Sequence, residues 1–185
     1  MKARDVLEQA LRIPRILWAA LTASQGLLLV VLFVQRGHVD GSRVVPTIDV
    51  LMMGVGAVGC AVASFIVPAR AYAQAARQHP QELVRPEPTG GYQPSVRFAH
   101  PVKAAQRAIA IGVTTLILKM ALAEAVSLNG FALGFLGARP AEFLPFFAVG
   151  VVLAAVRFPT VASLARPYEL AHGATFDASD AAPPL

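Results

Sequence analysis

The stretch that decides the fold runs from residue 108 to residue 138 and reads AIAIGVTTLILKMALAEAVSLNGFALGFLGA. Only two of its residues are charged, Lys119 and Glu124. About 20 mostly apolar residues in an α-helix are enough to cross a hydrocarbon layer about 30 Å thick. The stretch is therefore predicted to be a membrane-crossing helix that carries one carboxyl group near its middle.

Three other segments have the same character. Residues 16–34 and 50–69 contain no charged residue, and a fourth segment stays uncharged from Phe143 to Val156 before it passes Arg157. We expect Arg157 near the membrane interface, with its charged head drawn toward water. The predicted spans are about 16–35, 49–69, 108–136 and 142–164. The predicted fold class is all-α: a polytopic membrane protein with a four-transmembrane-helix bundle at residues 16–166.

The composition of the whole chain agrees with this fold. Of its 185 residues 56% are hydrophobic and 15% are charged, whereas soluble domains have about 45–50% and about 25%. A single cysteine excludes an internal disulfide and a cysteine-based metal cluster. The four histidines are scattered over loops and the tail, so no metal site is predicted. No serine or cysteine has a base beside it, and we expect neither an enzyme nor a cofactor.

The basic residues predict the orientation. They concentrate before the first span and between the second and third, whereas the two opposite connections hold only Arg36, Arg43 and Arg139. Short cytoplasmic segments are enriched in Lys and Arg, so both termini are expected to be cytoplasmic in a multi-pass protein of the cell (inner) membrane. These charges flank spans and lack interleaved aromatic residues, so the expected partner is the lipid bilayer and not a nucleic acid.

The segments outside the spans are predicted as follows. Residues 1–15 form a cytoplasmic N-terminal segment, in which Val6, Leu7, Ala10 and Leu11 share one stripe of a short interfacial helix. Residues 70–107 contain five prolines and Gly90-Gly91, which predicts an irregular cytoplasmic loop. Residues 167–185 are expected to be a disordered cytoplasmic tail.

The two halves of the bundle resemble each other at low resolution. Each is a helical hairpin whose second helix ends with a proline close to a basic residue, in residues 66–70 (IVPAR) and 156–159 (VRFP). Two helical-hairpin repeats would produce this pattern, and so would chance similarity between apolar helices.

Small residues mark positions where helices can approach closely. Residues 54–59 (GVGAVG) match the G-x-G-x-x-G fingerprint of dinucleotide sites, but no acidic residue lies about 20 positions on and no strand–helix alternation surrounds them. Helix packing, within the chain or between copies of a homo-oligomer, is the favoured interpretation. The expected packing glycines are Gly54, Gly56, Gly59, Gly130, Gly134 and Gly150.

Glu124 is the residue whose placement most needs an explanation. A charge at the centre of a bilayer costs about 2.5–3.5 kcal/mol on insertion scales, so a carboxyl group there faces protein, is paired or is protonated. Lys119 is five residues away and diverges from Glu124 by about 140° around the helix, which makes a direct pair poor. Hydrogen-bond partners are expected from Ser127, one turn further on, and from Gln25 or Ser24.

A family resemblance rests on the same segment. Residues 121–131 (ALAEAVSLNGF) resemble the ion-binding helix of the proteolipid subunit c of rotary ATP synthases, and the glycine-rich span before them is similar to its partner helix. Ala123 and Asn129 stand where that family typically has proline and tyrosine. The resemblance implies that Glu124 is a proton or sodium carboxylate and Ser127 a supporting ligand.

Two functions therefore remain open. One is a non-catalytic structural or assembly component of a membrane complex, in which Glu124 and Lys119 fix helix contacts with other membrane subunits or copies. The other is proteolipid-like binding or translocation of a proton or sodium ion. Its candidate residues are Glu124, Ser127, Asn129 and Gln25.

Overall fold

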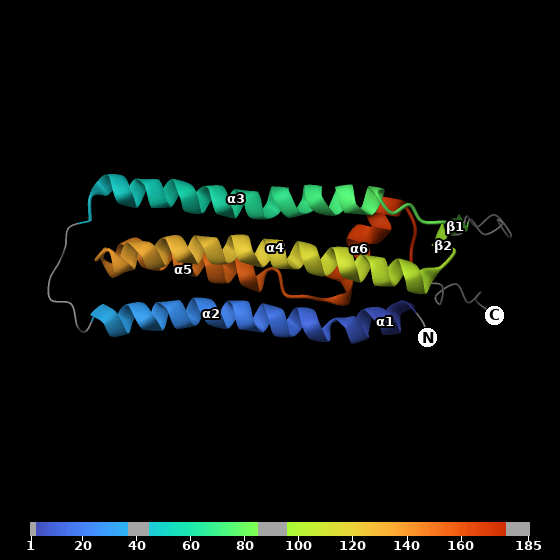
Figure 1. The fold of residues 1–185 in the computed structure, drawn as a ribbon, viewed down its shortest axis with the longest axis horizontal. Helices are drawn as coiled ribbons and strands as arrows, with labels where there is room; N and C mark the ends of the chain where they lie inside the picture. Colours follow the sequence, from blue (N-terminus) through green and yellow to red (C-terminus); the bar gives the residue numbers. More distant parts are fainter. Residues whose placement is uncertain (1–2, 37–44, 85–95, 177–185) are drawn as a thin grey trace, which may run out of the picture. The chain divides into compact units, whose positions relative to one another are not determined.

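A computed structural model describes residues 3–36, 45–84 and 96–176 (Figure 1). The chain is mostly helical. Six helices are present in this part: α1 (Ala3–Ala10), α2 (Arg12–Arg36), α3 (Thr47–Arg77), α4 (Pro101–Phe135), α5 (Pro140–Ala155) and α6 (Val161–His172). Two short strands, β1 (Leu83–Val84) and β2 (Arg97–Phe98), pair antiparallel, with Leu83 opposite Phe98.

The chain divides into two compact units. The apolar unit contains Arg15–Ala69 and Leu116–Phe158. The terminal unit contains Met1–Pro14, Arg70–Thr115 and Pro159–Leu185. The division falls within the long helices α3 and α4, so each of these helices has one part in the apolar unit and the other part in the terminal unit.

The apolar unit consists of segments of α2, α3, α4 and α5 that lie side by side with alternating direction (Figure 1). The helices that contain the first three predicted spans, α2, α3 and α4, are long and apolar enough to cross a membrane. The fourth, α5, is apolar but has only 16 residues.

The predicted fourth span, 142–164, is not one helix. Helix α5 ends at Ala155, and α6 begins only at Val161. Pro159 explains the break, because its ring prevents an interior helical hydrogen bond and disfavours helical geometry for Phe158 before it. Thr160 then caps α6 by accepting a hydrogen bond from the backbone N–H of Ser163.

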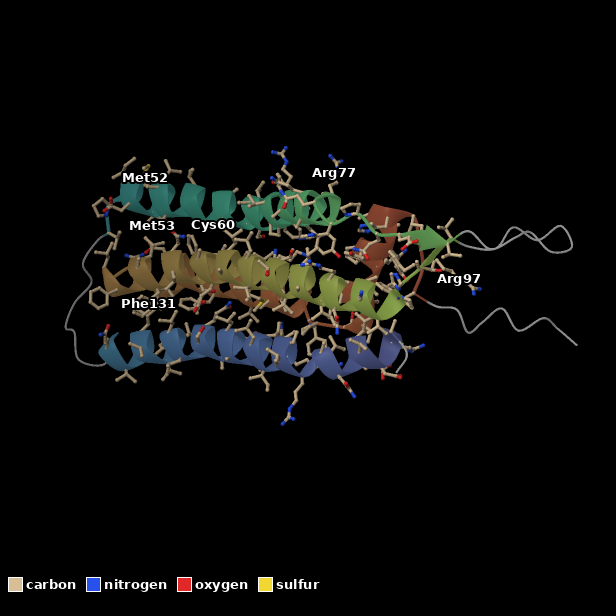
Figure 2. All side chains as sticks on the ribbon, turned by 45° about the vertical axis from the view of Figure 1, so that its right-hand side comes forward. Met52, Met53, Cys60, Arg77, Arg97 and Phe131 are labelled. Atoms are coloured by element: carbon tan, nitrogen blue, oxygen red, sulfur yellow. The ribbon has the colours of Figure 1, made fainter. Side chains whose placement is uncertain are left out.

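The outer faces of α2 and α3 carry many exposed large apolar side chains. On α3, Met52 points away from the neighbouring helices, whereas Met53 and Cys60 point toward α4 (Figure 2). Examples are Ile16 and Leu27 on α2 and Met52, Val55 and Val58 on α3. Exposed apolar side chains in this number are typical of protein that contacts lipid.

The interior of the apolar unit is built around α4. Leu133 of α4 packs with Leu32 of α2 and with Phe143 and Phe147 of α5. A second cluster joins Ala123 and Val126 of α4 to Ala57 of α3 and Leu153 of α5. Helix α4 therefore contacts each of the other three segments.

Glycines allow the closest of these approaches, but not at every predicted position. A Cβ atom on Gly130 would lie 2.9 Å from the backbone oxygen of Phe143, and one on Gly134 would lie 2.8 Å from Leu32 Cδ1. A Cβ atom on Gly54 or Gly59 would have no neighbour within 4 Å. The expectation that Gly54 and Gly59 are packing positions is therefore wrong for contacts within the described chain.

In the terminal unit, α1 packs against α6. Leu7 and Leu11 are buried beside Leu164 and Ala165. The short helix predicted near the N-terminus is present, and its apolar stripe is covered by protein.

The predicted irregular loop at 70–107 is wrong at both ends. Helix α3 continues through Pro68 to Arg77, and α4 begins at Pro101. Proline is well suited to the first turn of a helix, where its missing N–H would have no helical partner. Since Pro68 lies inside a helix and Pro159 between two helices, the two hairpin ends differ, and the repeat stays a hypothesis.

The predicted disorder at 167–185 is wrong for residues 167–176; residues 177–185 lie outside the described part. Helix α6 continues to His172 and ends at Gly173, whose positive φ of 63° suits a residue without a side chain. The backbone N–H of Thr175 then donates to the oxygen of Val96 at 3.0 Å. Phe176 packs on Phe98 with ring centroids 4.7 Å apart.

Tyr168 fills the centre of this aromatic cluster and is fully buried. Its hydroxyl group has no hydrogen-bond partner among the described residues. Burial raises the pKa of the Tyr168 phenol above its ordinary value, and the charge of Arg107 partly offsets that shift.

Replacing Tyr168 with Phe should leave the free energy of unfolding unchanged or raise it by up to about 1 kcal/mol at neutral pH, because the change removes an unpaired buried hydroxyl. Because the pKa of the phenol is raised in the folded state, the unfolded state loses this proton first as the pH rises. The contribution of the phenol to the free energy of unfolding is therefore constant below about pH 10 and decreases above it. The free energy of unfolding, measured at neutral pH and above pH 10, should fall less with rising pH in the variant than in the parent. Parallel pH profiles would contradict this assignment.

Replacing Gly130 with Ala should lower the free energy of unfolding by about 1–3 kcal/mol, because the new methyl group would overlap the backbone of α5. The matched control is Gly54→Ala, which meets open space and gains up to about 1 kcal/mol of helix propensity. Thermal unfolding in mild detergent measures both changes. Equal midpoints for the two variants would argue against the close contact of α4 with α5.

Candidate functional site

The candidate site is a polar cluster on the facing sides of α2 and α4, inside the apolar unit. Ser24 of α2 lies with its Oγ 2.7 Å from Oε1 of Glu124 on α4. Glu124 is half-buried. The expected contact between the carboxyl group and the first span is therefore made by Ser24.

Ser24 Oγ has two acceptors within reach. It donates to Oε1 of Glu124, and it also lies 2.8 Å from the backbone oxygen of Leu21 within α2. A serine hydroxyl has one proton, so the two acceptors share it. The contact with Glu124 is the one that joins two helices.

A second pair adjoins the first. The Ser127 hydroxyl on α4 donates to Oε1 of Gln25 on α2 at 3.2 Å, and both side chains are buried. Nε2 of Gln25 is buried without a hydrogen-bond partner in the described part of the chain. Two consecutive residues of α2 thus bind two residues of α4 that lie one turn apart.

Gly150 of α5 makes room for this second pair. A Cβ atom on Gly150 would collide with Ser127 Oγ, and it would lie 3.2 Å from Gln25 Oε1. The glycine therefore lets the backbone of α5 lie directly on the polar pair. Three helices contribute to the cluster, since α5 closes the side that α2 and α4 leave open.

Asn129, a candidate residue of the ion-binding site, does not contact Glu124 in the structure. Its side-chain nitrogen donates to the backbone oxygen of Ala125 at 2.8 Å. Its Oδ1 lies 3.4 Å from the position of a Cβ atom on Gly56, so it faces α3. Five residues along the helix separate Asn129 from Glu124, which turns the two side chains about 140° apart.

Lys119 and Arg157 form a separate group in the same unit. Nη1 of Arg157 donates to the backbone oxygen of Lys119 at 2.7 Å, and Nη2 donates to Ser64 Oγ on α3. The guanidinium group lies over the ring of Phe65, 5.1 Å from its centroid. Sequence reasoning placed Arg157 at an interface but missed these contacts. A serine in an otherwise apolar helix, Ser64, was the available signal.

No group of three or more potential metal ligands occurs among the residues that the structure describes. The chemistry of the polar cluster is therefore that of one carboxyl group, two hydroxyl groups and one carboxamide. Such a set can hold a proton and can fasten helices by hydrogen bonds.

Comparison of the chain with protein-family models, with curated proteins and with solved structures found no match. Function must therefore be argued from the residues and their geometry.

Replacing Ser24 with Ala should lower the free energy of unfolding by about 1–3 kcal/mol, because Glu124 would lose its partner on α2. The matched control is Thr22→Val, which removes only a hydrogen bond within α2, from Thr22 Oγ1 to the oxygen of Trp18. Thermal unfolding in mild detergent compares the two. A larger effect of Thr22→Val would refute the interhelical role of Ser24.

Proposed function

We propose that this chain is a multi-pass integral protein of the cytoplasmic membrane that acts as a non-catalytic structural or assembly component of a membrane complex. In this proposal α2, α3, α4 and α5 cross the membrane, and both termini are cytoplasmic. Its assembly partners are other membrane subunits or further copies of the chain. The observation that carries the proposal is the contact of Glu124 with Ser24.

The packing of α5 supports a fourth crossing despite its length. Its buried residues, Phe143, Phe147, Gly150, Leu153 and Ala154, extend along most of the helix. Sixteen residues span about 24 Å, which is less than a hydrocarbon layer of about 30 Å. A short helix of this kind can cross where the bilayer thins around it.

The polar contacts in this unit support a structural role. Ser24 and Gln25 join α2 to α4, and Arg157 joins the end of α5 to α3 and α4. Lipid supplies no hydrophobic force that drives helices together, so such hydrogen bonds and close packing hold the unit.

Proton binding is the second candidate function. Glu124 is half-buried in an otherwise apolar segment, and a carboxyl group in such a place is a candidate proton site. The resemblance to the proteolipid subunit c adds to this alternative.

The two candidates predict different results for two substitutions. Glu124→Gln retains a neutral hydrogen-bonding group but cannot exchange a proton, whereas Glu124→Ala removes the contact with Ser24. In the structural role, Glu124→Gln keeps the oligomeric state and the unfolding midpoint, and Glu124→Ala lowers the stability by about 1–3 kcal/mol. Proton flux into liposomes stays at background for the parent and both variants.

The decisive contrary result is a proton flux that the parent supports and Glu124→Gln abolishes while its oligomeric state is unchanged. That outcome favours the proton-binding alternative over the structural role. Glu142→Gln is the matched control, because Glu142 belongs to the first turn of α5 and accepts a hydrogen bond from the N–H of Arg139.

A further inference from the structure

Lys119 and Arg157 are half-buried positive charges of the apolar unit that have no acidic partner among the described residues. Among the described residues, the ion pairs are Arg4–Glu8 and His100–Glu82, and neither involves Lys119 or Arg157. The acidic residues of this unit that the structure describes are Asp49, Glu124 and Glu142. Asp49 and Glu142 belong to the first turns of α3 and α5, and Glu124 contacts Ser24.

The surroundings of this pair are apolar or uncharged. Both side chains are half-buried. The guanidinium group of Arg157 contacts a backbone oxygen, a hydroxyl group and the ring of Phe65. The positive charges of Lys119 and Arg157 also repel each other. Partly buried charges of one sign are unfavourable unless an anion compensates them.

Most of the hydrogen-bonding capacity of the pair is unused. Arginine has five N–H donors, and the protein contacts of Arg157 use its two Nη atoms once each. The Lys119 ammonium group makes no hydrogen bond that the described residues reveal. Guanidinium and ammonium groups are the donors that proteins use for phosphate.

The length of α5 places the pair where lipid phosphates are within reach. Arg157 follows a helix about 24 Å long. If α5 crosses the membrane, the bilayer thins around this short helix, and Arg157 then lies at the level of the lipid headgroups. Trp18 and Phe158 lie at the same end, with ring centroids 5.1 Å apart. Aromatic residues of this kind are typical of the interface.

We propose that Lys119 and Arg157 bind the phosphate group of an anionic phospholipid at this end of the apolar unit. The proposal rests on the proposed membrane crossing. The lipid headgroup supplies the counter-charge that the chain lacks here, and its acyl chains lie along the exposed apolar faces of the helices.

Trp18 makes the site measurable, because it is the sole tryptophan of the chain. Its indole N–H donates to the oxygen of Ala154 at 2.8 Å, close to Arg157 in the sequence. The full chain is reconstituted in phosphatidylcholine vesicles, and phosphatidylglycerol or phosphatidylcholine with brominated acyl chains is titrated in. Quenching of Trp18 fluorescence reports which lipid occupies the site.

The expected result is quenching by brominated phosphatidylglycerol at a lower mole fraction than by brominated phosphatidylcholine. Lys119→Gln should reduce this preference about fivefold, as expected for one basic residue near a lipid surface. Lys119→Arg should retain it. The control is Arg77→Gln, which removes an exposed charge in the terminal unit and should leave the preference unchanged.

Four outcomes would overturn the proposal. Equal quenching by both lipids, or a preference that survives Lys119→Gln, would refute the site while leaving the membrane crossing intact. A preference that inorganic phosphate at millimolar concentration removes would indicate a soluble anion as ligand. Absence of quenching by either lipid would instead refute the membrane placement on which the proposal rests.

Discussion

A polar group inside an apolar helix is stabilised there by a hydrogen-bond partner, and the arrangement of the apolar unit depends on such contacts. Glu124 contacts Ser24, Ser127 donates to Gln25, and Arg157 donates to the backbone of Lys119 and to Ser64. Each contact joins two helices or a helix to the segment after α5. Apolar side chains then fill the space between helices whose relative positions these few contacts specify.

The helices themselves follow from the sequence, because uncharged apolar runs of sufficient length have few alternatives. The uncharged runs 16–34 and 50–69 lie within α2 and α3, and α4 contains residues 108–135 of the third predicted span. Hydropathy alone could not locate the break after Ala155, since residues 158–165 contain no charged residue. The proline and Arg157 were visible in the sequence, but a proline alone does not decide between a break and a continuous helix, as Pro68 inside α3 illustrates.

Part of the candidate site was also within reach of sequence reasoning. Glu124 needed a polar partner, and α2 offers few polar residues near its middle, so Ser24 and Gln25 were natural candidates. Which of the two contacts Glu124, and which way Asn129 points, depends on how each helix is rotated about its axis. The spacing of small residues does not specify that rotation. The contacts of Arg157 with Ser64 and Lys119 join residues distant in the sequence. Ser64 signals a polar contact on α3 but does not reveal which residue makes it. Phe98 is likewise distant in the sequence from Tyr168 and Phe176, and all three lie in segments predicted to be a loop and a tail.

The packing of Phe176 makes the C-terminal end of the described chain part of the folded terminal unit. Residues 174–176 run beside β2, and the ring of Phe176 packs on Phe98 and faces Tyr168. Shortening the chain to the end of α6 would thus uncover an aromatic interior. A fusion partner attached after Phe176 would start from a fixed point on the terminal unit, and its linker would need to be designed from there.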